Sequence, residues 1–367
     1  MRPQAHLPRL ASLVRLALLV LSVVVLLSAV SSALAPLASA APAPHVLART
    51  AVLIDGASGA VIWQRDAHRP VLVASTTKIL TALVADDSYA ADKVFTVPQS
   101  AEEVDGTRFG YQRGMRVRRH DLLTTLLLVS ANDAAETLAA AYPRGGRAGF
   151  LAAMQAEAKA LGGTDSTWRD PSGLDAPGHR ASAADLAILG RVLLARPELA
   201  GIVATQWTRY RWPGGRVQII TNHNHLVSQG RDPGAIGIKT GYTERAHSTI
   251  VAAERRAGRT LIGVALGSDS MYADIRSMFT YGFANRAPPG AEVLGGVQAG
   301  RSSSLGPTSL KAAPGRGASG SASSLPPSSD TVLTRLLPAP LPALATAAVA
   351  LLVLGGMVMS LSRSRRR

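Results

Sequence analysis

Two long apolar runs, one near each end of the 367-residue chain, most constrain what it can fold into. Residues 16–30 follow a segment that carries Arg2, Arg9 and Arg15, and they precede the small-residue sequence Ala38-Ser39-Ala40. This order is typical of a secretory signal, with a basic region, an apolar stretch and an A-x-A cleavage site. We therefore expect residues 1–40 to be a signal peptide. An uncleaved signal anchor is the alternative, and it places the middle of the chain on the same, outer side of the membrane.

The second run, residues 341–361, carries no charge. It has the length of about 20 residues that a transmembrane helix needs. Residues 362–367 contain four arginines, which remain on the cytoplasmic side according to the positive-inside rule. The two ends agree on one topology: an extracytoplasmic catalytic body, held at the cell membrane by a C-terminal helix with a cytoplasmic basic tail.

The composition limits what lies between these runs. Residues 286–335 are rich in Gly, Ser, Pro and Ala and lack apolar periodicity, so we expect a flexible tether there and a folded domain at residues 47–285. The absence of cysteine excludes disulfides, thiolate zinc sites and cysteine nucleophiles. The net charge of +15 comes with only 4% aromatic residues, and its densest basic run lies beside the apolar C-terminal stretch. We therefore expect no nucleic-acid partner.

The pattern of the domain mixes strands and helices. Residues 51–64 predict a hairpin around an Asp-Gly turn, and a second hairpin is expected around residues 256–259. Helical spacing covers residues 79–84, 120–142 (with a break near Ser130), 148–163, 181–195 and 271–283. Strands at both ends with helices between them predict a mixed α/β (α+β) fold, in which an antiparallel sheet is flanked by helices and carries an inserted helical lobe.

Three short motifs carry the candidate chemistry, and the first is Ser75-Thr76-Thr77-Lys78. Residues three apart share one helix face, about 5–6 Å apart at Cβ, so the Lys78 amine can reach the Ser75 hydroxyl. Serine becomes a nucleophile when a base takes its proton, and lysine can be that base only if its pKa is lowered. Taken alone, the motif fits a simple helix cap as well.

The other two motifs supply what the first one lacks. In Ser130-Ala131-Asn132, a hydroxyl could relay a proton and an amide could orient a substrate carbonyl. In Lys239-Thr240-Gly241, a second cation could lower the pKa of Lys78 and attract an anionic substrate, while the glycine permits close backbone approach. A turn and an exposed strand are the corresponding structural interpretations.

In this order, the motifs resemble the S-x-x-K, S-x-N and K-T-G set of penicillin-recognising serine enzymes. The surrounding stretches "STTKILTAL", "SANDAAETLA", "DPSGLDAPGHRASAADLAIL" and "GIKTGYT" are similar to the serine-type D-alanyl-D-alanine carboxypeptidases, the low-molecular-mass penicillin-binding proteins. The resemblance covers residues 47–283. It implies the serine β-lactamase/transpeptidase-like fold, no cofactor and no metal.

The resemblance also implies roles for individual residues. Ser75 is the acylated nucleophile, Lys78 its base and Ser130 the proton shuttle. Asn132 holds the peptide amide, and the terminal carboxylate is bound by Lys239 and Thr240. Gly241 completes that motif, and the N–H groups of Ser75 and Tyr242 form the oxyanion hole. The expected reaction removes the terminal D-alanine from peptidoglycan stem peptides, and β-lactam antibiotics are expected to acylate the same serine.

Alternatives remain open. A D,D-endopeptidase that cleaves peptide crosslinks is not separated from a carboxypeptidase by sequence. A class A-like β-lactamase needs a deacylating glutamate, but Glu136, Glu157 and Glu198 do not stand in the E-x-x-L-N pattern of that family. A wall-binding or sensor protein without activity is disfavoured by the intact motifs.

Two positions differ from the usual pattern of the family. Met271 stands where relatives often have an arginine that helps to bind the carboxylate, with Arg276 further on, and His247 stands where a glycine is usual. His223 and His225 alternate as in a strand and could ligate a metal, although a surface or structural role is favoured.

Overall fold

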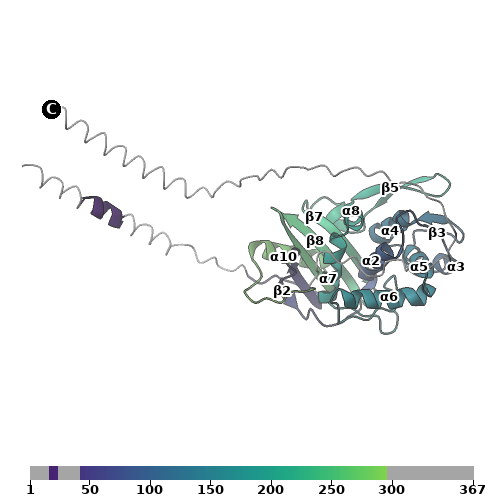
Figure 1. Cartoon of the computed structure of the whole chain (residues 1–367), viewed down its shortest axis with the longest axis horizontal. Helices are drawn as coiled ribbons and strands as arrows, with labels where there is room; N and C mark the ends of the chain where they lie inside the picture. Colours follow the sequence, from purple (N-terminus) through teal and green to yellow (C-terminus); the bar gives the residue numbers. More distant parts are fainter. Residues whose placement is uncertain (1–15, 24–41, 296–367) are drawn as a thin grey trace, which may run out of the picture. The chain divides into compact units, whose positions relative to one another are not determined.

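The computed structural model of the protein describes residues 16–23 and 42–295. Residues 16–23 are helical, and residues 42–295 fold around a central sheet (Figure 1). Among the described residues, no helix is long and apolar enough to span a bilayer. The predicted helix at 341–361, the basic tail and most of the predicted signal peptide and tether lie outside the described residues.

A five-stranded antiparallel sheet forms the centre of the fold, in the order β2-β1-β9-β8-β7. Its strands are β1 (Thr50–Asp55), β2 (Val61–Arg65), β7 (Ala235–Thr243), β8 (His247–Arg256) and β9 (Arg259–Ser268). Both predicted hairpins are confirmed, as β1–β2 and β8–β9. Strands from the two ends of the domain meet at the β1–β9 pair. The strand order places β2 and β7 at the two edges of the sheet.

Alternate residues of β1 face two different apolar layers, as the period of two in a strand requires. Val52 and Ile54 join the large core under the helical lobe, whereas Ala51 and Leu53 pack with α10 (Met271–Ala284). The sheet is therefore covered on both faces, with α7 (Ala183–Leu194) against β1 and β9 on the first face (Figure 1). The prediction of a sheet flanked by helices is confirmed.

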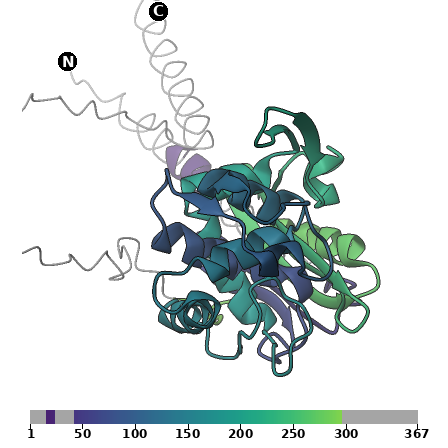
Figure 2. The same ribbon diagram turned by 90° about the vertical axis from the view of Figure 1, so that its right-hand side faces the viewer.

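The inserted helical lobe contacts β7, and its blue and teal helices face the viewer in Figure 2. It contains a 3-10 turn, η1 (Ala74–Thr77), and the helices α2 (Lys78–Ser88), α3 (Gln99–Glu102), α4 (Arg119–Leu128), α5 (Asn132–Ala140) and α6 (Gly146–Ala160). The predicted break near Ser130 is real and separates α4 from α5. Sequence patterning also located α7 and its cap, since the Ser182 hydroxyl accepts the Asp185 N–H at 3.0 Å.

Several shorter elements were not predicted. They are the two-stranded sheets β3–β4 (Val94–Thr96 and Arg116–Arg118) and β5–β6 (Trp207–Arg211 and Val217–Thr221), with helices α8 (Pro197–Ala204) and α9 (His225–Ser228). Strands of three to five residues have too few alternating positions to stand out from loops. Of these elements, α8 and α9 contact β7.

The folded unit extends beyond the boundary at residue 285 that the composition predicts. The Glu292 carbonyl accepts the Val61 N–H at 2.8 Å, and the Leu294 N–H is donated to the Gly59 carbonyl at 3.0 Å. Leu294 is also buried in the main core. Residues 286–295 therefore belong to the folded unit, because their backbone pairs with the β1–β2 hairpin and one side chain fills the core.

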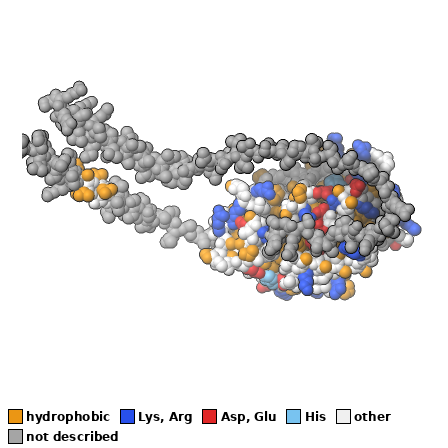
Figure 3. Space-filling view, in the orientation of Figure 1, with side chains coloured by type: hydrophobic (Ala, Val, Ile, Leu, Met, Phe, Trp, Pro, Cys, Tyr) orange, Lys and Arg blue, Asp and Glu red, His pale blue; other side chains and the backbone are white. Residues whose placement is uncertain are grey.

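On the part of the folded unit that Figure 3 leaves uncovered, basic, acidic and apolar side chains lie interspersed.

Candidate active site

The candidate nucleophile, Ser75, lies in the η1 turn immediately before α2. The turn begins at Ala74, whose φ of +48° lies in the left-handed region that a residue with a Cβ adopts at a cost. Two threonines hold it there: the Thr76 hydroxyl donates to the Val73 carbonyl at 2.7 Å, and the Thr77 hydroxyl to the Ala74 carbonyl at 2.9 Å. The predicted helix start is therefore a tight 3-10 turn that presents a half-buried Ser75.

Lys78 is fully buried and has three polar partners. Its Nζ lies 2.8 Å from Ser75 Oγ, 2.7 Å from Asn132 Oδ1 and 2.6 Å from the Ser172 carbonyl oxygen. A neutral amine has two N–H donors and one lone pair, which match two oxygen acceptors and one hydroxyl donor. The surroundings are therefore suited to a neutral Lys78 that accepts the proton of Ser75.

Burial and a second cation both lower the pKa of Lys78 well below its usual range. Desolvation is the larger cause and the charge of Lys239 comes next, while Asp170 and Asp133 act in the opposite direction. The charge of Lys239 thus acts on the pKa of Lys78 in the predicted direction. The neutral form of Lys78, which a lowered pKa favours, is the form that can act as a base.

Ser130 and Asn132 lie in the bend between α4 and α5. Ser130 has a φ of +63° and is buried. The Asn132 amide group is held at both ends, since Oδ1 accepts from Lys78 and Nδ2 donates to the Asp105 carbonyl at 2.6 Å. Asn132 thus orients Lys78, a role that was not predicted, and its second amide hydrogen remains suited to a substrate carbonyl.

The edge strand β7 brings the third motif against the nucleophile turn. A Cβ added at Gly241 would lie 2.6 Å from the Ser75 backbone nitrogen, which is closer than real contacts allow. The glycine that was predicted to permit close approach therefore does so toward the protein's own nucleophile. The adjacent Tyr242 is 68% exposed. The oxyanion hole formed by the N–H groups of Ser75 and Tyr242 stays a prediction.

Lys239 is almost fully buried, and its Nζ donates to the Thr240 carbonyl at 2.7 Å. Burial lowers the pKa of Lys239 to about 7. Near neutral pH its charge is thus sensitive to any anion that enters the site, since an opposite charge nearby favours the protonated form.

Residues 170–173 form a loop that supports Lys78 and that was not predicted to contribute to the site. One oxygen of Asp170 accepts the N–H groups of Ser172, Gly173 and Leu174 and the Ser172 hydroxyl, at 2.6–3.1 Å. This loop presents the Ser172 carbonyl to Lys78, and a Cβ on Gly173 would lie 1.9 Å from the Ala74 carbonyl. The Asp-Pro-Ser-Gly sequence, a typical turn, was the signal that could have indicated it.

His179 supports the nucleophile turn from the same side. Its Nδ1 accepts the Arg169 N–H at 3.0 Å, so Nε2 carries the hydrogen and donates it to Thr77 Oγ1 at 2.9 Å. Burial lowers the pKa of His179 to about 4, so the ring is neutral.

The residues that depart from the family pattern have structural explanations. Arg276 forms a two-pronged pair with Asp232 at 2.9 and 2.8 Å, and Met271 packs against the apolar layer under α10. His247 has a φ of +56°, which explains why glycine is suited to that position. Within residues 16–23 and 42–295, His223 and His225 belong to no group of three possible metal ligands.

Comparison with known proteins agrees with this geometry. Residues 37–270, more than half of the chain, match the D-alanyl-D-alanine carboxypeptidase family, Peptidase_S11. The D-alanyl-D-alanine carboxypeptidase DacB2 of Mycobacterium tuberculosis is 36% identical over 258 residues, which are 67% of this chain and 86% of that protein. DacF of Bacillus subtilis is 27% identical over 64% of this chain, and the match spans 62% of that relative's length.

Solved structures show the same likeness. A D-alanyl-D-alanine carboxypeptidase from M. tuberculosis superposes with a TM-score of 0.64 at 35% identity, covering 70% of this chain and 98% of that one. The DD-transpeptidase of Streptomyces K15 gives 0.63 at 25% identity, over 67% of this chain and all of that one. The match to the family model and the likeness to DacB2 show that the chain belongs to the D-alanyl-D-alanine carboxypeptidase family.

Proposed function

We propose that the protein is a penicillin-sensitive serine peptidase that removes the terminal D-alanine from D-Ala-D-Ala stem peptides of peptidoglycan. The observation that carries the proposal is the 2.8 Å contact between Lys78 Nζ and Ser75 Oγ, made by a lysine whose pKa is lowered well below its usual range. A serine paired with a neutral amine is an activated nucleophile.

The reaction proceeds through an acyl-enzyme. Lys78 takes the Ser75 proton as Oγ attacks the penultimate carbonyl, and the negative charge that forms on the carbonyl oxygen is stabilised by backbone N–H groups beside Ser75. When the C–N bond breaks, Ser130 gives its proton to the departing nitrogen and takes up the one held by Lys78, so D-alanine leaves as the amine and Lys78 is neutral again. Water then hydrolyses the ester and restores Ser75.

Substrate anchoring is assigned to Lys239 and Thr240 on β7. The substrate's terminal carboxylate raises the pKa of Lys239 when it binds beside this lysine, because an opposite charge nearby favours the protonated form. Since Arg276 is paired with Asp232, carboxylate binding depends on these two residues more than in relatives that supply an arginine.

The β-lactamase alternative is disfavoured by what surrounds the three glutamates. Glu136 pairs with Arg147 at 2.9 Å, and Glu198 pairs with Arg119 at 2.6 Å. Burial raises the pKa of Glu157, whose side chain lies in α6. None of the three takes part in the hydrogen bonds found around Ser75 and Lys78 in the described part of the chain.

For location, we propose export through residues 1–40 and tethering at the cell membrane through residues 341–361. The apolar sequence of both segments and the arginines at the C-terminus support this. Fractionation of cells, with protease added from outside, tests it: a body that resists protease in intact cells would contradict the topology.

The activity is tested with the full-length protein and the peptide diacetyl-L-Lys-D-Ala-D-Ala. We expect release of D-alanine, and labelling of the wild type but not of Ser75→Ala by a fluorescent penicillin. Cleavage of crosslinked dimers alone would favour the endopeptidase. A labelled Ser75→Ala variant would refute the mechanism.

A further inference from the structure

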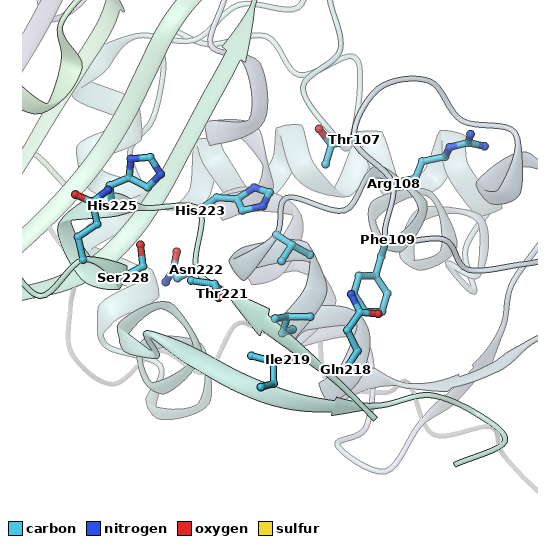
Figure 4. A pocket seen from close by; sticks show the side chains of 13 residues that line it. Thr107, Arg108, Phe109, Gln218, Ile219, Thr221, Asn222, His223, His225 and Ser228 are labelled. Atoms are coloured by element: carbon cyan, nitrogen blue, oxygen red, sulfur yellow. The ribbon is translucent and has the colours of Figure 1, made fainter. Parts of the chain in front are cut away.

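An open pocket of about 650 Å³ reaches Val129, the neighbour of Ser130, and takes no part in the mechanism above. It is lined by the loop 107–109, by residues 218–223 at the end of β6, and by Val129 and three residues of the α9 region (Figure 4). Its volume lies within the roughly 300–1,000 Å³ that is typical of ligand pockets. A single alanine side chain needs much less space.

In the mechanism proposed above, the leaving group departs beside Ser130, and the pocket borders the residue that precedes Ser130. Val129, which precedes the proton shuttle Ser130, is one of its lining residues. The His223 N–H is donated to the Leu128 carbonyl at 2.9 Å, so the His223 segment lies against the end of α4. Lys239, which is assigned to the terminal carboxylate, is close enough for its charge to act on the His223 ring.

The charge of the pocket favours an anion. Of the described residues that line it, none is acidic, while Arg108, His223 and His225 are basic. The Arg108 guanidinium is bound to the Glu102 carbonyl, and the His225 ring stacks on Tyr272 with centroids 5.4 Å apart. His223 differs from both, because its ring projects into the space opposite the Thr107–Phe109 loop (Figure 4).

His223 is also suited chemically to meet a carboxylate. Desolvation lowers the pKa of His223, and so do the charges of Lys239 and His225, which favours a neutral ring that can donate one N–H. The apolar walls, which include Ile219 and Phe109, leave room for the carbon atoms of a side chain.

We propose that this pocket is a leaving-group subsite for a residue larger than D-alanine that carries a second carboxylate, and that His223 recognises this carboxylate. The proposal rests on the peptidase function proposed above. The subsite would make the enzyme prefer a C-terminal residue with an acidic side chain, a preference that the three catalytic motifs do not predict.

The test uses the full-length protein and three peptides, diacetyl-L-Lys-D-Ala-D-Xaa, in which Xaa is D-Ala, D-Gln or D-Glu. D-Gln and D-Glu have the same shape and differ in charge. Since a hydrogen bond to a charged group is roughly twice as strong as a neutral one, we expect kcat/KM for D-Glu to exceed that for D-Gln by about tenfold. Equal values for these two peptides would overturn the subsite.

Two variants assign the effect to one residue. In His223→Glu, two like charges meet, so the D-Glu/D-Gln ratio is expected to fall below one. His120→Gln, on the exposed side of α4 where His120 pairs with Glu198, is the matched control and should keep the wild-type ratio. Labelling of Ser75 by fluorescent penicillin verifies that each variant has an intact site.

The results separate the two proposals. An unchanged ratio in His223→Glu, with D-alanine still released from the first peptide, overturns the role of His223 alone. Release of no D-amino acid from any of the three peptides overturns the peptidase function, and the subsite with it.

Discussion

Two buried lysines, Lys78 and Lys239, determine the chemistry of the site at the scale of single residues. Burying an ammonium group is costly unless it is paired, so both side chains have lowered pKa values. They also act on each other, because the charge of Lys239 disfavours a second charge on Lys78. This arrangement makes one lysine a base and leaves the other as the cation that meets the substrate.

The role of Lys78 as a base predicts that Lys78→Arg is inactive. Arginine keeps the positive charge but does not lose its proton in proteins, so Ser75 would have no acceptor. We expect the rate of acylation by a fluorescent penicillin to fall by about 10²–10⁴-fold, which is the usual contribution of general-base catalysis. Lys93→Arg, at an exposed position, is the control. Wild-type labelling by Lys78→Arg would show that another group accepts the proton.

The coupling between the lysines predicts a shift in pH dependence. Removing the charge in Lys239→Ala should raise the pKa of Lys78, because the repulsion that lowers it is lost. A base with a higher pKa stays protonated to higher pH. The rise in penicillin acylation rate with pH should therefore have its midpoint at higher pH in the variant, whatever the maximal rate. A midpoint that stays in place or moves to lower pH would exclude this coupling.

At the scale of elements, the site depends on how closely the β7 edge approaches the η1 turn. Ser75 and Gly241 are 166 positions apart in the sequence, and the two segments meet because β7 is the last strand of the sheet on the side of the helical lobe. The bend between α4 and α5 and the loop 170–173 complete the surroundings of Lys78. Each element contributes one or two polar atoms, so small shifts between the elements should affect activity more than stability.

Gly241→Ala tests this close approach. The new methyl group would overlap the Ser75 backbone nitrogen, at 2.6 Å, and would push β7 away from the nucleophile. We expect acylation to fall by about 100-fold or more, since a displacement of about 1 Å has this effect on positioned reactants. Circular dichroism should show that the fold is retained.

Gly201→Ala is the matched control, because Gly201 lies in α8 and a Cβ there meets no atom within 4 Å. That variant should acylate at the wild-type rate and gain up to about 1 kcal/mol of stability from better helix propensity. Normal acylation by Gly241→Ala would mean that β7 need not touch the turn.

At the scale of the whole molecule, the C-terminal boundary of the folded unit has a structural function. Residues 292–294 pair with the β1–β2 hairpin, and the Arg191 guanidinium donates to the Gly295 carbonyl at 2.9 Å. This segment therefore closes one side of the core before the chain continues toward its C-terminus.

Leu294→Ala measures what this closure contributes. Leu294 is 4% exposed and Val293 is 58% exposed, so the two neighbours provide a matched pair. We expect Leu294→Ala to lower the free energy of unfolding by about 2–4 kcal/mol, from lost burial and the cavity left behind. Val293→Ala should change it by less than about 0.5 kcal/mol. Urea unfolding of the two variants compares them directly, and equal stabilities would place the end of the folded unit before residue 286.

Local sequence patterns were sufficient to predict most helices and hairpins of the fold. The hairpin turns, the helical periodicity and the Ser182 cap depend on neighbouring residues, so they were predicted correctly from sequence. The termini of the domain were also expected to share one sheet, and they do. The three- to five-residue strands of β3–β4 and β5–β6 were missed because so few positions carry no clear period.

The candidate site, too, could be predicted only in part from the sequence. Because the order of the three motifs is visible in sequence, the nucleophile, the base and the residues of β7 could be named from it. Only the tertiary structure places the Ser172 carbonyl and Asn132 Oδ1 on Lys78 and joins His179 to the nucleophile turn. It alone also pairs Arg276 with Asp232 and opens a pocket beside His223. Residue types follow from the chain, whereas distances, burial and therefore pKa values depend on which distant segments pack together.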